Sequence, residues 1–300
     1  MITATGPSRT VLGAVLLTTS WIFFTTEMVS VRILSDTLSI PQIAVFRLLV
    51  QLVALVPILV LMRGSVLKTN RLGAHFARAA CSGIGMLLFY LTFALLPLAL
   101  ATTLTFLQAM FMMVLAAVLL GETIGPRRIA AVVVGFFGVL IVMRPGFATV
   151  DPGMLVALAA AFVASLLMIL TRSLSATESR WTIMFYSAAL GLGIIALPAA
   201  LRWEQLELSH LPLLALVGVA GTLGQFLMVG AFQVAEASAL ATVDYVRLIF
   251  AVAAGYVLFD EVPDVWTWLG AGVILSAVAY ATHRARAAAQ AHPHAPSQVD

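Results

Sequence analysis

Long apolar runs, separated by short polar segments, follow one another along the whole chain. Each is about 20 residues long, the length an α-helix needs to cross about 30 Å of hydrocarbon. The runs lack the alternation of barrel strands, and backbone groups facing lipid must bond within their own segment, so each run predicts a helix. The sequence therefore predicts an all-α integral membrane protein with ten transmembrane helices. The runs cover approximately residues 11–33, 42–62, 75–96, 99–120, 128–144, 153–174, 181–201, 211–232, 238–259 and 265–283.

Composition supports the same class. Hydrophobic residues make up 62% and charged residues only 10% of the chain, with a mean hydropathy of +1.08, whereas soluble proteins carry roughly 25% charged residues. The first run is too long for a secretory signal, so we interpret it as helix one. Residues 287–300 are polar and proline-bearing, which predicts a disordered tail. Cys81 is the only cysteine and excludes an intrachain disulfide; we expect no metal site and no cofactor.

Positive charges gather on one side of the predicted membrane. With the N-terminus inside, the inner segments hold eleven Arg and Lys residues and the outer ends hold three. Since the cytoplasmic side retains positive charge, both termini are predicted to be cytoplasmic. No basic stripe suggests a nucleic acid partner. The inner residues are Arg9, Arg63, Lys68, Arg71, Arg78, Arg127, Arg128, Arg172, Arg180, Arg284 and Arg286; the outer ones are Arg32, Arg144 and Arg202.

The two halves of the chain repeat each other. Ala-Leu-Ala-Thr occurs at 99–102 and again at 239–242, a shift of 140. Three further pairs of landmarks recur at shifts of 139 to 141: Arg32 with Arg172, Pro57 with Pro198, and Glu122 with Glu261. Five helices thus form one unit, and because five is odd, the second unit is inverted. Inverted repeats are typical of alternating-access transporters. We expect repeats at 1–148 and 149–286.

The end of each repeat carries a family pattern. "MVLAAVLLGETIGPRRIAAVVVGFFGVLIV" resembles the end of an EamA-type domain of the drug/metabolite transporter superfamily, and "AVAAGYVLFDEVPDVWTWLGAGVIL" resembles its second copy. The resemblance covers nearly the whole chain, and it is nearest to aromatic amino acid exporters. It implies export of amino acids or related small metabolites across a bacterial inner membrane. The chain departs from the pattern at Gln108 and Arg247, where proline is common, and at Ala131, where glycine is common.

Charged residues inside the apolar runs are the main candidates for function, because a charge at mid-membrane is unfavourable by about 2.5–3.5 kcal/mol on insertion scales and therefore faces the bundle interior. Asp244 and Arg247 share one helical face and are predicted to pair in the transport cavity, where they would meet a carboxylate or ammonium; the alternative is a static clamp. Glu27 and Arg47 lie at similar depth in helices one and two. We expect them to pair as an outer gate, or else as a permanent brace.

Five polar or aromatic residues near mid-membrane are further cavity candidates, with packing between helices as the alternative: Trp21, Tyr90, Gln108, Ser165 and Tyr245.

Glu122 and Glu261 are expected to cap helices or contact loops. Metalloprotease, nucleophile-elbow and phosphate-loop motifs are missing from the sequence, so no catalytic residue is assigned. The sequence thus predicts a transporter that exports amino acids, aromatic ones among them, or related small metabolites by alternating access. A passive channel or facilitator for other small metabolites or drugs is the alternative. The expected partners are the small-molecule substrate and membrane lipid; the oligomeric state stays open, and a monomer is compatible with the sequence.

Overall fold

The computed structural model describes residues 7–62, 64, 67–120, 126–144, 151–175, 177–235, 240 and 243–291 of the 300-residue chain. All the regular elements in these ranges are helices. The α-helices are α1 (Pro7–Leu34), α2 (Ile40–Leu61), α3 (Leu72–Leu95), α4 (Leu98–Thr105), α5 (Leu107–Leu120), α6 (Pro126–Met143), α7 (Pro152–Ser175), α8 (Arg180–Leu201), α9 (Leu211–Val234), α11 (Val246–Phe259) and α12 (Val265–Ala291). Two short 3₁₀ helices, η2 (Leu208–His210) and η3 (Val243–Tyr245), precede α9 and α11.

The helices confirm the predicted fold class. Seven helical segments of the described chain are long and apolar enough to cross a membrane, and three shorter apolar ones, Val132–Met143, Val246–Phe259 and Val265–Tyr280, complete the series. These ten segments coincide with the ten apolar runs. At the end of the chain, α12 continues to Ala291, because the alanine-rich residues 287–291 favour a helix. The other residues of the predicted tail lie outside the described part.

Two of the ten membrane segments are interrupted, which the sequence did not predict. The run 99–120 divides at Phe106 into α4 and α5, and in the described part of the run 238–259 the 3₁₀ helix η3 lies directly before α11, which begins at Val246. In the first copy, the Phe106 amide bonds to the Thr103 carbonyl at 3.3 Å and the Thr105 hydroxyl donates to the Thr102 carbonyl at 2.7 Å. Such local bonds compete with the helix ladder. α5 begins at Leu107 and α11 begins at Val246, a shift of 139, so the irregular turns before them lie at equivalent places in the two repeats.

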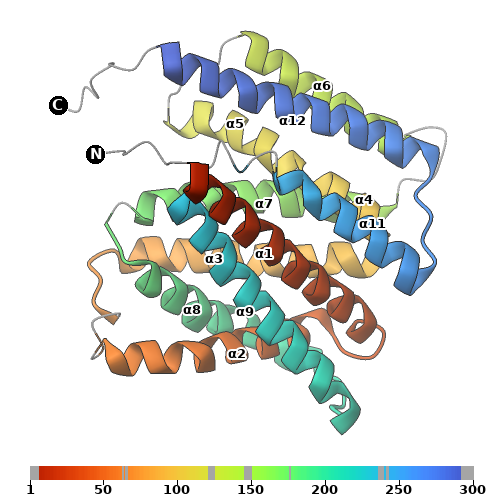
Figure 1. The fold of residues 1–300 in the computed structure, drawn as a ribbon. Coiled ribbons are helices and arrows are strands. Elements are labelled where there is room, and N and C mark those ends of the chain that lie inside the picture. Colours follow the sequence, from red (N-terminus) through yellow and green to blue (C-terminus); the bar gives the residue numbers. More distant parts are fainter. Residues whose placement is uncertain are drawn as a thin grey trace.

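Successive membrane segments run in alternating directions. Figure 1 shows α1 beginning and α12 ending on the same side of the bundle, whereas α1 and α7 begin on opposite sides. We call the side with the α1–α2 turn the Asp36 end, and the side with the α2–α3 connection the Lys68 end. The second repeat is therefore inverted relative to the first.

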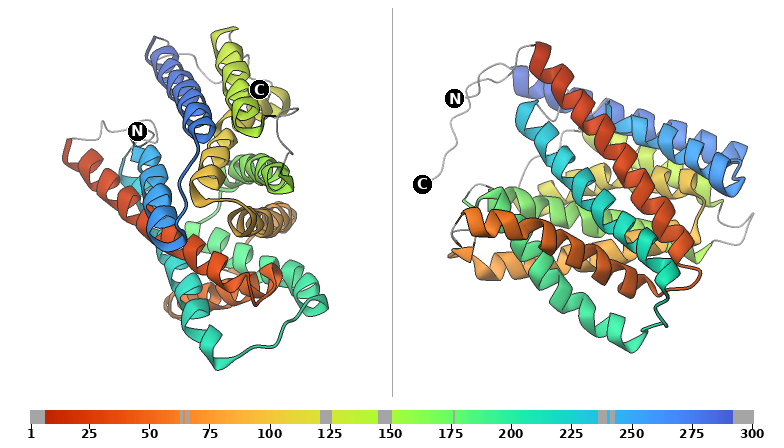
Figure 2. Two further views of the ribbon diagram at one scale, coloured as in Figure 1. Left: turned by 90° about the vertical axis from the view of Figure 1, so that its right-hand side faces the viewer. Right: turned by 60° about the horizontal axis from the view of Figure 1, so that its bottom comes forward.

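Helix contacts repeat with the same symmetry. The contact of α1 with α9 corresponds to that of α7 with α3, and the contact of α3 with α8 corresponds to that of α9 with α2. The pairs α2–α8 and α6–α12 are each their own symmetry equivalent. The views in Figures 1 and 2 show α6 and α12 side by side along one edge of the bundle, with α2 and α8 at the opposite edge. The two repeats thus interlock around a pseudo-two-fold axis.

The α6–α12 pair crosses at two glycines. A Cβ atom at Gly138 would lie 3.1 Å from the Gly270 carbonyl oxygen, and one at Gly270 would lie 2.8 Å from the Gly138 carbonyl oxygen. The absence of side chains lets the two backbones approach closely, as is common between membrane helices.

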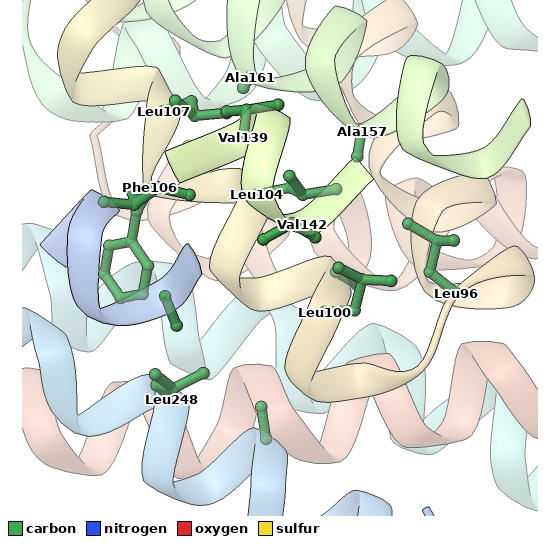
Figure 3. Packing of buried hydrophobic residues seen from close by; sticks show 14 of the residues in the cluster. Leu96, Leu100, Leu104, Phe106, Leu107, Val139, Val142, Ala157, Ala161 and Leu248 are labelled. Atoms are coloured by element: carbon green, nitrogen blue, oxygen red, sulfur yellow. The ribbon is translucent and has the colours of Figure 1, made fainter. Parts of the chain in front are cut away.

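The main apolar core surrounds the break at Phe106. Figure 3 shows Phe106 between α4, α5 and the start of α11, with Leu104, Val139 and Leu248 close by. These side chains are 8% exposed or less. Their packing joins α4, α5 and α6 of the first repeat to α11 of the second, and it fixes the geometry of the interrupted segments.

Candidate functional site

A small cavity lies between the interrupted segments. Its volume is about 20 Å³, room for about one water molecule. Its wall comes from α1, α3, α4 and α11, so both repeats contribute to it. The lining residues are Trp21, Thr25, Met28, Phe89, Phe93, Thr102, Thr105, Arg247 and Ala251.

Arg247 supplies the cation of this cavity. The break before α11 places it in the first turn of that helix. Its guanidinium carbon lies 3.8 Å from the centre of the Phe106 ring and 5.0 Å from that of the Trp21 ring. Cation–π contacts of a desolvated guanidinium are worth about 2 kcal/mol, which helps to hold a charge at this depth. The side chain of Asp244 lies outside the described residues, so the Asp244–Arg247 pair stays a prediction.

The other predicted cavity residues divide into two groups. Trp21 lines the cavity, and Tyr245 packs against Phe106 with ring centres 5.7 Å apart. Gln108 and Ser165 lie where α5 meets α7, outside the cavity wall. The Gln108 amide donates to the Ala164 carbonyl at 3.5 Å, and the Ser165 hydroxyl donates to the carbonyl of Phe162 in its own helix at 2.6 Å. A substrate-binding role for these two stays a prediction.

Tyr90 belongs to a separate buried network with Glu27 and Arg47. Arg47 Nε lies 3.3 Å from Glu27 Oε1, so the predicted ion pair is present. The Tyr90 hydroxyl donates to the same oxygen at 2.5 Å, and the other Arg47 nitrogens donate to Gln51 and, at 3.2 Å, to Gln225. The network joins α1, α2 and α3 to α9 of the second repeat.

This network lies well inside the bundle near the Asp36 end. Glu27 is seven residues before the end of α1 and Arg47 is seven residues after the start of α2, which gives both the same depth. They are 5% and 7% exposed. Gln51 and Gln225 were not predicted from the sequence, although a polar amide inside an apolar run could have indicated them. Gly221 leaves the space for Glu27, since a Cβ there would lie 2.5 Å from Glu27 Oε1.

A second ion pair closes the Asp36 end. Arg32 Nη1 lies 2.5 Å from Glu261 Oε1 and 3.1 Å from the Leu96 carbonyl oxygen. The other Glu261 oxygen accepts from the Leu98 amide at 2.8 Å, so the expected capping role of this glutamate is confirmed. One carboxylate therefore links the end of α1, the start of α4 and the end of α11. Glu122 lies outside the described residues.

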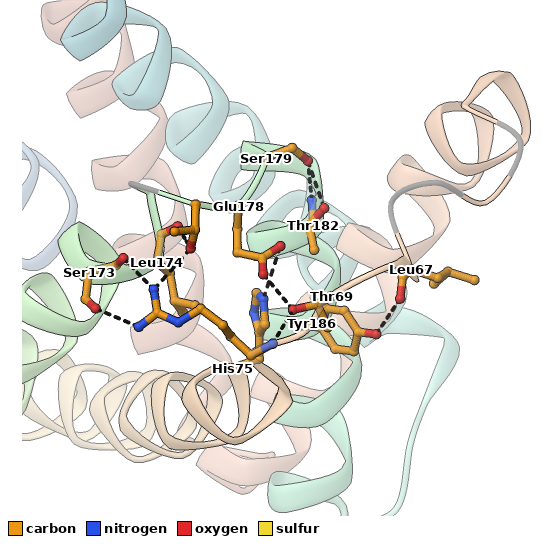
Figure 4. A network of polar contacts seen from close by, with 11 residues as sticks. Leu67, Thr69, His75, Ser173, Leu174, Glu178, Ser179, Thr182 and Tyr186 are labelled. Atoms are coloured by element: carbon orange, nitrogen blue, oxygen red, sulfur yellow. Dashed lines mark hydrogen bonds and ion pairs between the residues drawn. The ribbon is translucent and has the colours of Figure 1, made fainter.

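Hydrogen bonds also close the Lys68 end, around the start of α3 (Figure 4). The Thr69 hydroxyl donates to Glu178 at 2.6 Å, and the Tyr186 hydroxyl donates to the Leu67 carbonyl at 2.8 Å. Arg71 donates to the backbone and side chain of Ser173. Polar contacts therefore join the helices at both ends of the bundle.

Inverted five-helix repeats, interrupted helices at equivalent places and a small cavity lined by both repeats define a multi-pass membrane transporter. The chain belongs to the EamA-like transporter family, whose model matches residues 11–144 and 151–282. A solved structure described as "Crystal structure of protein" is similar in fold, with a TM-score of 0.57, 21% identity, and coverage of 94% of this chain and 98% of the other.

Relatives carry several kinds of substrate. The chain is 31% identical over 240 residues to the S-adenosylmethionine uptake transporter of Rickettsia bellii, covering 80% of this chain and 82% of the other. It is 27% identical to the riboflavin transporter of Rhizobium johnstonii, with 91% and 92% covered, and 28% identical to a pseudopaline exporter of Pseudomonas aeruginosa, with 84% and 89% covered. None of these three is named for aromatic amino acids, so the expected nearness to such exporters stays a prediction.

Proposed function

We propose that the protein transports, by alternating access, a small metabolite that has an amino-acid carboxylate beside a flat apolar group. One observation carries this proposal: Arg247 lies against aromatic rings in a cavity between two interrupted helices. A guanidinium binds a carboxylate through two parallel hydrogen bonds. Trp21, Phe89 and Phe93 offer faces and edges to a flat ring, and the nearby threonine hydroxyl oxygens can accept hydrogen bonds from an ammonium group.

Amino acids, aromatic ones among them, belong to this substrate class. We propose their export, or that of related metabolites, across a bacterial inner membrane with both termini cytoplasmic, because the positive charges gather at the Lys68 end. Polar contacts between helices at both ends favour a carrier over a passive channel. The repeats would span 1–148 and 149–286, with a boundary that lies outside the described residues, and a tail would follow α12, which continues to Ala291.

Uptake of S-adenosylmethionine is the second candidate, favoured by the relative of 31% identity. This compound also has an amino-acid carboxylate and a flat ring, so the same cavity chemistry would serve it. The two candidates differ in direction and in the size of the ring system.

The Glu27–Arg47 pair would act as a gate toward the Asp36 end. When that end opens, water reaches the pair and lowers the cost of separating the charges; when it closes, desolvation favours their contact. Gln225 ties Arg47 to the second repeat, so movement between the repeats changes the contacts of the pair. A permanent brace is the alternative for this pair.

Flux into liposomes that contain the purified protein tests the proposed substrate class. The panel is phenylalanine, phenylalaninamide, S-adenosylmethionine and riboflavin. We expect saturable flux of a carboxylate-bearing compound, and a KM raised about tenfold or more in Arg247→Gln, since a hydrogen bond to a charged group is worth about 1.5–3 kcal/mol. Arg202→Gln, which changes an exposed arginine, is the matched control. Flux of phenylalanine and S-adenosylmethionine equal to that of protein-free liposomes would contradict the proposal, whether or not riboflavin or phenylalaninamide is transported.

A further inference from the structure

Arg78 is a second buried arginine, far from the pair at Glu27. It lies six residues into α3, about 9 Å along the helix from its start at the Lys68 end. The residue is 7% exposed. Its Nε donates to the Thr171 hydroxyl of α7 at 2.9 Å, while its Nη1 is buried without a hydrogen-bond partner. In the part of the chain that the structure describes, no carboxylate forms an ion pair with Arg78.

A neutral hydroxyl does not compensate this charge. The Thr171 hydroxyl already donates its hydrogen to the Leu167 carbonyl at 2.7 Å, so it offers Arg78 only a lone pair. A buried cation without a counter-ion is costly, and ionisable groups inside membrane segments commonly mark substrate pathways. Arg78 Nη1 is therefore a hydrogen-bond donor that could bind an oxyanion.

His75 lies one turn nearer the Lys68 end and also has a buried nitrogen without a hydrogen bond. It is 1% exposed, and its Nε2 is buried without a hydrogen bond. Glu178 Oε2 lies 3.9 Å from that nitrogen, at the end where Thr69 holds the carboxylate. Residues three apart lie on the same helical face, so α3 presents both nitrogens on one face, with Arg78 deeper than the glutamate.

The inverted repeat shows that the fold does not need a cation here. The ends of α3 and α9 correspond at a shift of 139, from Leu72 to Leu211 and from Leu95 to Val234. Arg78 then corresponds to Val217, which is completely buried. An apolar residue thus satisfies the same helix contact in the other repeat, and the charge at Arg78 calls for a ligand.

We propose that Arg78 is a carboxylate-binding subsite on the path between the Lys68 end and the central cavity. When α3 and α7 separate, its guanidinium binds the carboxylate of the substrate before Arg247 does. This inference rests on the proposed function, because it takes the substrate carboxylate from there. The burial of Arg78 among helices favours a solute over a lipid headgroup as the source of the oxyanion.

Transport from each face of oriented vesicles tests the subsite. We expect Arg78→Gln to raise the KM about tenfold or more when a carboxylate substrate is supplied at the Lys68 end, and to leave the KM unchanged at the Asp36 end. Arg78→Lys should restore most of the affinity. Lys68→Gln, an exposed cation at the same end, is the control. An equal change at both faces, or a change that appears only with anionic lipid, would overturn the proposal.

A second measurement does not depend on which substrate is carried. Thr171→Cys is made with Cys81→Ser, and the new thiol is treated at the Lys68 end with a negatively charged methanethiosulfonate and with a neutral one. We expect the ratio of the anionic to the neutral labelling rate to be about tenfold higher when Arg78 is present than in Arg78→Gln. If the anionic reagent is preferred in this way but no panel compound is transported, the proposed substrate class is contradicted and the anion subsite is still supported. Equal ratios, or no labelling by either reagent, would overturn the subsite itself.

Discussion

The two repeats make equivalent helix contacts with unlike side chains. Arg47 in α2 and Ser187 in α8 are 140 residues apart, and their helices correspond end to end at that shift. Arg47 binds Glu27, Gln51 and Gln225 across three helices. Ser187 is equally buried, at 8% exposed, yet within the described part of the chain its side chain makes one hydrogen bond, to the Ser82 hydroxyl at 3.3 Å.

This difference separates what the fold needs from what transport needs. Small and apolar residues satisfy the contact on the Ser187 side, so the backbone symmetry does not require charge. Under the proposed function, the charges on the Arg47 side would serve a single direction of opening or a single orientation of the substrate. Variants of the two repeats test this difference.

Removing Arg47 should have the largest effect. Arg47→Gln leaves Glu27 buried without its counter-ion, which costs about 3–5 kcal/mol. We expect a marked drop in the unfolding temperature in detergent and loss of transport. Ser187→Ala, the matched change in the other repeat, removes one hydrogen bond between neutral groups and should cost about 1 kcal/mol.

The charge swap Glu27→Arg with Arg47→Glu extends this test. It should restore part of the transport that Glu27→Gln and Arg47→Gln each lose, because an ion pair is present again. Full transport in both single variants, with normal expression, would rule out both a gate and a brace.

Gly221→Ala should have a moderate effect. The new Cβ would lie 2.5 Å from Glu27 Oε1, and Arg47 and Tyr90 prevent that carboxylate from moving freely. Overpacking of this kind costs about 1–3 kcal/mol. Gly193→Ala in α8 is the control, since a Cβ there meets nothing within 4 Å; it should be neutral or stabilise the helix by up to about 1 kcal/mol. Equal unfolding temperatures for the two variants would show that Gly221 does not hold the network in place.

The exposed Arg144–Asp264 pair should have the smallest effect. Partial burial by itself raises the pKa of Asp264, but hydrogen bonds from Thr267 and the charge of Arg144 together hold that pKa below its ordinary value. A carboxyl whose pKa is lower in the folded state stabilises the protein above its unfolded pKa, about 3.9, and this contribution is lost as the pH falls through the folded pKa.

Asp264→Asn should therefore lower stability by at most about 1 kcal/mol near neutral pH, as is usual for exposed pairs. The difference from the parent protein should vanish in acid. Unfolding temperatures measured from pH 7 down to pH 3 would test this, and a difference that grows toward low pH would contradict the assignment.

Hydropathy and the repeated landmarks were enough to predict ten helices and their inverted arrangement, because membrane length and the odd number of segments dictate both. The pairing of Glu27 with Arg47 followed from equal depth. The break at Phe106 could not be predicted, since threonine hydroxyls such as that of Thr105 also bond to carbonyls of the preceding turn in unbroken helices. The roles of Gln51 and Gln225 depend on which helices meet, which apolar periodicity does not specify.

Counterflow tests the central claim of alternating access most directly. Liposomes that contain the protein are loaded with an unlabelled compound from the panel, diluted, and given a trace of the same compound in labelled form. A carrier that exposes one site to each face in turn should give transient accumulation of label above its equilibrium level, and Arg247→Gln should reduce it. Label that rises only to equilibrium, at a rate that does not saturate, would show a passive channel and contradict alternating access.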